Sequence, residues 1–236
     1  MPTRSRKRKP QLVGVIASLA DLRFALHMRQ PPDLFELRLD CLCEMVDQLE
    51  RKMSILSAPV IITARDPREG GIANLSLAHR RDLLLRFLPY AKYIDVELRS
   101  ARAFKSLLER ARQEKVFLIL SLHDFKSTPS PGSLRSKASL AKALGADIFK
   151  IACRTDSPAQ LARLINFVPS KGHAGGRRDG RRQVGLSLSA MGIGKLGVLS
   201  RLLLARSGSV LNYCSLHKSQ VEGQPSIELL RSALRP

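Results

Sequence analysis

The sequence contains no tryptophan, and aromatic residues make up only 5% of its 236 residues. Proteins that bind single-stranded nucleic acid stack bases on aromatic side chains, so this low content argues against nucleic-acid binding as the main function. Acidic residues are also few, because 20 Asp and Glu stand against 40 Lys and Arg, for a formal net charge of +20. Basic surface attracts phosphate of any sequence, so a basic nucleic-acid-binding protein stays open as an alternative. The same charge would draw in a small anionic substrate.

Long apolar runs and cysteine motifs are missing as well. No apolar stretch approaches the roughly 18 residues of a membrane-spanning helix, so no membrane partner is expected. The first ten residues are basic and lack the apolar segment of a secretory signal, which predicts a cytoplasmic protein. The four cysteines show no Cys-x-x-Cys spacing, and the five histidines occur singly. Free thiols and no metal site are therefore expected.

Short apolar, β-branched runs alternate along the chain with helical patterns. The runs predict eight strands, at 12–18, 34–40, 60–65, 93–98, 116–124, 148–153, 184–189 and 210–216. Helical spacing occurs between them, for example at 78–88, 101–113, 134–144, 159–167 and 196–205. This pattern favours an α/β fold of the parallel (β/α)8 barrel type over an open doubly wound sheet. We expect residues 1–10 to form a basic arm, residues 11–236 one catalytic domain, and the basic segment 171–182 a surface loop.

Polar side chains gather late in the predicted strands, at the end where a (β/α)8 enzyme has its active site. They are Ser18, Glu36, Arg38, Arg65 and His123, with Lys150 inside the sixth strand. Residues two apart in a strand point to one side, so Glu36 and Arg38 share a face. Asp95 and Glu97 share a face of the fourth strand in the same way. One of these faces must point into the barrel.

Lys150 lies in the apolar run Ile148-Phe149-Lys150-Ile151-Ala152. Burying a charged ammonium group among such side chains is energetically unfavourable. Roughly one unperturbed lysine in a thousand is a free amine at neutral pH. Apolar burial or a nearby cation lowers a lysine pKa, and the free amine can form a Schiff base with a carbonyl. A lysine on an edge strand that reaches water is the structural alternative. His123 ends the preceding strand and could then abstract a proton from the carbon next to the imine.

A set of short motifs occurs in one order from about Leu12 to Leu234. They are Glu36-Leu37-Arg38-Leu39-Asp40, Thr63-Ala64-Arg65 with Glu69-Gly70-Gly71, Asp95-Val96-Glu97-Leu98, Ser121-Leu122-His123-Asp124-Phe125, Phe149-Lys150-Ile151-Ala152, Gly194-Lys195-Leu196-Gly197-Val198-Leu199-Ser200-Arg201 and Gly223-Gln224. Together they resemble type I 3-dehydroquinate dehydratase. The resemblance implies a (β/α)8 enzyme of the shikimate pathway that converts 3-dehydroquinate to 3-dehydroshikimate and water, with no metal or external cofactor. It also suggests a homodimer.

The resemblance assigns roles to individual residues. Lys150 would form the Schiff base with the ring ketone. His123 would take the C2 proton and deliver one to the departing C1 hydroxyl, and Glu69 would orient it. Arg201 would hold the substrate carboxylate with its planar guanidinium. The other expected substrate-binding residues are Ser18, Glu36, Arg38, Arg65, Met191, Gln220 and Gln224, the last in a loop that closes over the site. Gln220 departs from the family's pattern, which has a small serine there.

Two other enzyme classes fit part of the sequence. A class I aldolase shares the barrel, the lysine and the imine, but it breaks a carbon–carbon bond and does not require the Glu-x-Arg and Ser-Arg elements. A dinucleotide-binding enzyme would fit Gly192-Ile193-Gly194-Lys195-Leu196-Gly197, which has the G-x-G-x-x-G form. No Asp or Glu occurs between Asp179 and Glu222, so the acidic ribose ligand is missing. The aldolase remains the alternative enzyme.

Overall fold

The computed structural model describes residues 10–168 and 186–234. Its strands are β1 Gln11–Ile16, β2 Leu34–Arg38, β3 Val60–Thr63, β4 Ala91–Glu97, β5 Phe117–Asp124, β6 Ile148–Arg154, β7 Ser187–Ile193 and β8 Leu211–Ser215. Its α-helices are α1 Leu19–Leu26, α2 Val46–Glu50, α3 Leu77–Phe87, α4 Lys105–Gln113, α5 Pro131–Ala143, α6 Pro158–Phe167, α7 Gly197–Ser207 and α8 Ile227–Leu234. Short 3-10 helices are η1 Cys43–Met45, η2 Met53–Ile55, η3 Pro67–Glu69 and η4 Leu88–Tyr90. The segment 171–182 and residues 1–9 of the expected arm lie outside the described residues.

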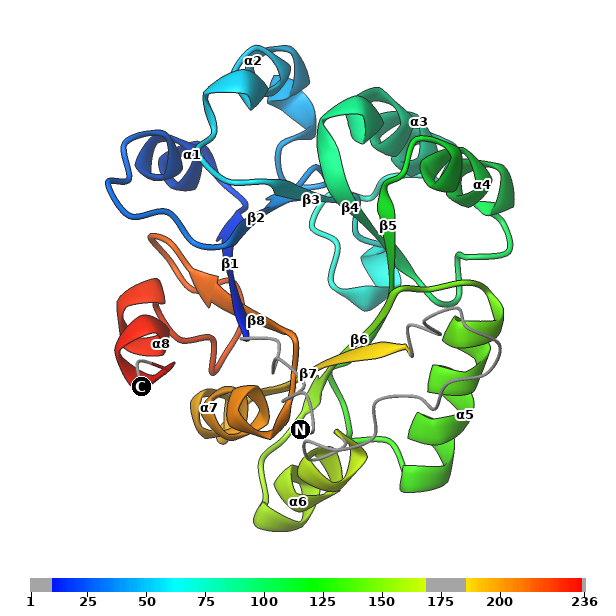
Figure 1. Ribbon diagram of the computed structural model, residues 1–236, viewed down its shortest axis with the longest axis vertical. Coiled ribbons are helices and arrows are strands. Elements are labelled where there is room, and N and C mark those ends of the chain that lie inside the picture. The colour runs from blue at the N-terminus through cyan, green and yellow to red at the C-terminus, as the bar shows by residue number, and fades with distance from the viewer. Residues whose placement is uncertain (1–9, 169–185, 235–236) are drawn as a thin grey trace, which may run out of the picture.

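The strands form one parallel sheet in the order β7-β6-β5-β4-β3-β2-β1-β8. The two end strands of this order meet, because Ser189 Oγ of β7 donates to the carbonyl of Leu211 in β8 at 2.8 Å. The amide of Val210 also donates to the carbonyl of Leu188 at 2.9 Å. Figure 1 shows the resulting ring of strands with the helices outside it. The predicted (β/α)8 barrel is therefore confirmed.

Alternate residues of each strand face the barrel interior. In β2, Phe35 and Leu37 pack outward in the layer between sheet and helices, whereas Leu34 and Glu36 face inward. Toward the N-terminal ends of the strands, the interior holds the aliphatic side chains of Val13, Leu34, Ile61, Ile119, Ile148 and Leu211. Two residues further along, four of these strands carry the polar groups Glu36, Thr63, Ser121 and Lys150. The interior thus becomes polar toward the C-terminal ends, where barrel enzymes bind substrate.

The predicted strand bounds lie within two residues of the observed ones except in β7. The prediction placed this strand at 184–189, but it runs from Ser187 to Ile193 and pairs along its length with β6. The apolar residues after Ser189 continue the strand instead of beginning a loop. Two site residues are displaced from strand ends: β1 ends at Ile16, before Ser18, and β3 ends at Thr63, before Arg65.

The described residues include no helix of the length and apolar character that crossing a membrane requires.

Candidate active site

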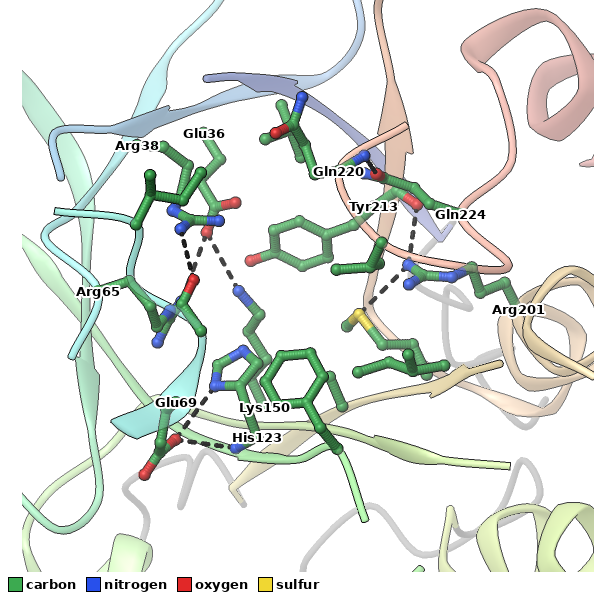
Figure 2. Close-up of a pocket in the computed structure, with 18 residues that line it drawn as sticks. Glu36, Arg38, Arg65, Glu69, His123, Lys150, Arg201, Tyr213, Gln220 and Gln224 are labelled. Atoms are coloured by element: carbon green, nitrogen blue, oxygen red, sulfur yellow. Dashed lines mark hydrogen bonds and ion pairs between the residues drawn. The ribbon is translucent and has the colours of Figure 1, made fainter. Parts of the chain in front are cut away.

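A cavity lies at the C-terminal ends of the strands. Its polar lining consists of Glu36, Arg38, Arg65, Glu69, His123, Lys150, Arg201, Tyr213, Gln220 and Gln224 (Figure 2). Its other lining residues are Val15, Gly70, Ile72, Phe125, Ala152, Met191, Ile193 and Val221. Every site residue predicted from the sequence except Ser18 is in this lining, although the residues come from segments far apart in the chain.

Lys150 lies in the middle of β6 with 3% of its surface exposed. Its Nζ is 2.8 Å from Oδ2 of Asp95 and 3.1 Å from Oε1 of Glu36. It also lies 4.0 Å from the centre of the Tyr213 ring. The apolar surroundings expected from the sequence are therefore wrong in part, because carboxylates from β2 and β4 hold the amine. The edge-strand alternative is also wrong, since β6 lies between β5 and β7.

A buried ion-pair network fixes these carboxylates. Arg65 Nη1 lies 3.2 Å from Oδ1 of Asp95 and 2.9 Å from Oε1 of Glu97. Ser121 Oγ donates to Oδ1 of Asp95 at 2.6 Å. Burial opposes ionisation of Asp95, but the charges of Arg65 and Lys150 outweigh it and hold the pKa of Asp95 well below its usual range. Removing one member of a buried ion pair lowers the stability of the fold by about 3–5 kcal/mol. The network therefore holds Lys150 in a fixed position.

His123 and Glu69 form a second pair beside the lysine. β5 pairs with β6 so that Ser121 is opposite Lys150, which puts His123 two residues closer to the cavity mouth. Oε2 of Glu69 lies 3.2 Å from Nδ1 of His123 and accepts the backbone amide of the same residue at 2.9 Å. Nδ1 therefore faces the carboxylate, and Nε2 is left to exchange a proton with a ligand.

Burial shifts the pKa of both members of this pair. It raises the pKa of Glu69 to about 7, with a smaller contribution in the same direction from the Glu97 charge. Burial also lowers the pKa of His123 well below its usual value, helped by the charges of Arg65 and Lys150. His123 is thus neutral near pH 7, the form in which an imidazole can accept a proton. Glu69 is not an exposed loop carboxylate, because its side chain is buried.

Arg201 is a buried cation in α7 with no carboxylate in contact among the described residues. Its Nη1 donates to the carbonyl of Tyr213 at 3.0 Å and lies 3.4 Å from Sδ of Met191, while its Nε has no hydrogen-bond partner in those residues. Burial lowers its pKa to about 10. A buried guanidinium without a counter-charge is costly, so the position suits a ligand carboxylate.

The loop between β8 and α8 covers one side of the cavity. The backbone amide of Gln220 donates to Oε1 of Gln224 at 2.7 Å, and Gln220 Nε2 donates to the carbonyl of Lys218 at 3.1 Å. Glu222 ties the loop to the end of β6 through an ion pair of 3.0 Å with Nη1 of Arg154. Two polar side chains of a loop thus face the cavity while bonded within the loop itself.

The sequence pattern of the type I 3-dehydroquinase family matches residues 17–236. The chain belongs to that family. It is therefore a 3-dehydroquinate dehydratase, a lyase of the shikimate pathway, and the class I aldolase alternative falls away.

Individual relatives agree with this assignment. The 3-dehydroquinate dehydratase of Shouchella clausii is 30% identical over 216 residues, which cover 86% of this chain and 80% of the relative. That of Pyrococcus abyssi is 31% identical over 207 residues and covers 86% of both chains. The crystal structure of the enzyme from Geobacillus kaustophilus superimposes with a TM-score of 0.82 at 25% identity, over 96% of this chain and 90% of the other.

Ser18 lies outside the cavity lining of this type I 3-dehydroquinase. Its side chain caps α1 by accepting the amide of Asp21 at 3.1 Å, and its hydroxyl donates to Oδ2 of Asp21 at 2.7 Å. The prediction treated Ser18 as a strand-end residue, but a serine three positions before an aspartate at the start of a helical pattern is equally typical of a helix N-cap.

Two residues of the dehydratase site received no role from the sequence. Asp95, which contacts Lys150, was noted for sharing a face with Glu97 and as part of a family motif, but without a role. Tyr213 was missed altogether, although Leu211 and Tyr213 follow the period of two that marks the inward face of β8. The sequence analysis considered only apolar burial or a nearby cation around Lys150, whereas its observed partners are carboxylates from other strands.

Proposed function

We propose that Lys150 is the residue on which this dehydratase forms its Schiff base. The observation that carries the proposal is the position of its amine, which is buried at the centre of the cavity and held 2.8 Å from Asp95 and 3.1 Å from Glu36. After giving up a proton, the amine attacks the C3 ketone of 3-dehydroquinate, and loss of water leaves an iminium. Its positive charge draws electrons from the adjacent C2–H bond and acidifies that hydrogen. The two carboxylates stabilise the iminium electrostatically.

His123 is the acid and base of the proposed mechanism. Its neutral imidazole takes the C2 proton, the electrons of that bond move toward the iminium nitrogen, and an enamine results. The imidazolium then gives a proton to the C1 hydroxyl, which leaves as water as the C1–C2 double bond forms. Glu69, 3.2 Å from Nδ1, orients the ring and stabilises its transient positive charge. Addition of water to the new iminium releases 3-dehydroshikimate and restores Lys150.

The remaining groups of the cavity orient the substrate. Arg201 pairs with the carboxylate of 3-dehydroquinate, and Met191 packs against the ring. The expected hydroxyl ligands are Glu36, Arg38 and Arg65, and Gln220 and Gln224 close the loop over the bound ring. The Arg65 guanidinium is already bonded to Asp95, Glu97 and Ser121, so we assign its main effect to holding the carboxylates in place.

We further propose a cytoplasmic homodimer that does not bind nucleic acid. The four cysteines, all in the described part of the chain, are free thiols, as is usual in a reducing compartment. The dimer follows the family resemblance, and light scattering of the purified protein would give a mass near twice that of one chain. The positive charge is assigned to attraction of the anionic substrate.

Steady-state assays of three variants test the residue roles. The product carries a new conjugated double bond, so its ultraviolet absorbance reports turnover. Lys150→Ala should lower kcat by several orders of magnitude while the fold stays intact by circular dichroism. Arg201→Ala should raise KM about 10- to 100-fold with a smaller effect on kcat, because one charge-assisted contact is lost. Lys142→Ala, an exposed position on α5, serves as the matched control and should behave like the wild type.

Wild-type turnover of 3-dehydroquinate together with near-normal kcat in folded Lys150→Ala would contradict the lysine assignment. No turnover by the folded wild type would contradict the proposed function as a whole.

A further inference from the structure

Tyr213 carries a buried hydroxyl that the mechanism above does not use. The residue lies in β8 with 3% of its surface exposed, and it lines the cavity. Its hydroxyl oxygen has no hydrogen-bond partner among the described residues. Buried polar groups are almost always paired, so an unpaired one that borders a cavity points to a partner on the ligand.

The position of Tyr213 relative to Lys150 and His123 narrows the choice of that partner. The Lys150 amine lies 4.0 Å from the centre of the Tyr213 ring. In Figure 2, the amine stands between the Tyr213 ring on one side and the His123 imidazole on the other. Once Lys150 is bonded to the ketone carbon, the carbon that faces His123 must be C2, which loses the proton. The other neighbour of the ketone carbon, C4, then faces Tyr213, and in 3-dehydroquinate C4 carries a hydroxyl group.

We propose that the Tyr213 hydroxyl hydrogen-bonds the substrate's C4 hydroxyl and makes the enzyme selective for ring ketones hydroxylated at that carbon. This inference rests on the proposed function, because it uses the imine at Lys150 to orient the ring. Burial, together with the negative charges of Glu36 and Asp95, raises the pKa of Tyr213 well above its usual value. The phenol is therefore protonated at every working pH and can donate its hydrogen to the C4 oxygen.

The C4 hydroxyl can hydrogen-bond both Tyr213 and Glu36, because a hydroxyl is both an acceptor and a donor. Its oxygen accepts from the phenol, and its hydrogen is free for the carboxylate of Glu36, whose Oε1 lies 3.1 Å from Lys150 Nζ and whose charge acts on the Tyr213 phenol. A site built around such a hydroxyl discriminates against an analogue without it, because the protein groups are then left buried and unpaired.

A comparison of two substrates in three proteins tests the proposal. The substrates are 3-dehydroquinate and its analogue that lacks the C4 hydroxyl. The proteins are the wild type, Tyr213→Phe and the control Tyr90→Phe, which removes a half-exposed hydroxyl that donates to Glu50. We expect Tyr213→Phe to lower the kcat/KM preference for the hydroxylated substrate about tenfold, and Tyr90→Phe to leave it unchanged. The thermal midpoint of ligand-free Tyr213→Phe should equal or exceed that of the wild type, because no protein contact is lost.

Each other outcome contradicts the proposal in a distinct way. An unchanged preference in Tyr213→Phe would mean that the hydroxyl does not touch the substrate. A lower kcat for both substrates with the preference unchanged would assign Tyr213 to positioning Lys150. A loss of thermal stability or of folding would assign the hydroxyl to the structure of the free protein. If the wild type turned over neither substrate, the proposed function itself would fail, and that result is distinguishable from the other three.

Discussion

In the proposed mechanism Glu69 supports His123, because the two side chains share one buried contact of 3.2 Å. Burial raises the pKa of Glu69 to about 7, so near neutral pH the carboxyl exists in both protonation states. The ionised form can accept the Nδ1 hydrogen of His123 and stabilise the imidazolium, whereas the protonated form cannot. The activity of the free enzyme should therefore follow the ionisation of Glu69.

A pH profile of Glu69→Gln tests this dependence. In the wild type, kcat/KM should fall as the pH drops through about 7, because Glu69 takes up its proton there. In Glu69→Gln, which cannot ionise, that decline should vanish and the plateau should be roughly 100-fold lower. Glu109→Gln, on the outer helix α4, is the control and should retain the wild-type profile. A decline near pH 7 that persists in Glu69→Gln would assign it to another group.

The role of a single residue was predictable where its residue type is rare at that place in a strand. A lysine in an apolar strand and a histidine at a strand end indicated the proposed catalytic pair, and the family's motifs added Glu69 and Arg201. Ser18 was misplaced because a hydroxyl at a strand end and a helix N-cap look alike in sequence. Tyr213 was not found because a tyrosine in a buried strand is ordinary, and only the three-dimensional contact with Lys150 marks it.

At the scale of elements, the loop between β8 and α8 depends on a close approach of two turns. Gly223 has φ +77, a left-handed conformation that favours glycine. A Cβ there would lie 2.5 Å from the carbonyl oxygen of Gly194 and 2.7 Å from Cα of Gly197. The glycines of the G-x-G-x-x-G pattern thus allow the turn before α7 to pack against this loop, which gives them a structural role in place of the nucleotide role rejected from the sequence.

Gly223→Ala should therefore displace the loop and weaken substrate binding. We expect KM to rise about tenfold or more and the thermal midpoint to fall, because both the backbone conformation and the packing are strained. Gly132→Ala is the matched control, since a Cβ at that position in α5 meets nothing within 4 Å. It should be neutral or more stable by about 0.5–1 kcal/mol. Equal KM values for Gly223→Ala and the wild type would show that the position of this loop does not affect substrate binding.

The strands themselves were largely predictable, because their inward and outward faces follow a strict period of two. β2 shows this well, with Phe35 and Leu37 on one face and Glu36 on the other. The exception, β7, begins with alternating serines and leucines and ends with Met191, Gly192 and Ile193, a sequence that also suits a turn. Pairing with β6 on one side and contact with β8 on the other extend it as a strand.

At the scale of the whole molecule, the excess of basic residues is the least expected property of a metabolic enzyme. The formal net charge is +20. A positive surface raises the local concentration of an anion and speeds its encounter with the site, and added salt screens this effect. The barrel architecture was predictable from the alternation of strand and helix patterns. The purpose of the charge was not predictable from the sequence, because the same basic side chains attract both phosphate and a small carboxylate.

The salt dependence of kcat/KM tests substrate attraction. Raising the ionic strength from about 0.01 M to about 0.5 M should lower kcat/KM several-fold and leave kcat nearly unchanged, because screening acts on encounter and binding before the chemical steps. Sucrose at matched viscosity is the control for slower diffusion. A kcat/KM that does not respond to salt would show that the charge serves another purpose.

Covalent capture tests the central claim, that Lys150 forms an imine with 3-dehydroquinate. The protein is mixed with 3-dehydroquinate and sodium borohydride, which reduces an imine to a stable secondary amine, and intact and peptide masses are measured. We expect one adduct per chain, on the peptide that contains Lys150, and none on folded Lys150→Ala. An adduct on another lysine, or no adduct on a wild-type protein that turns over the substrate, would contradict it.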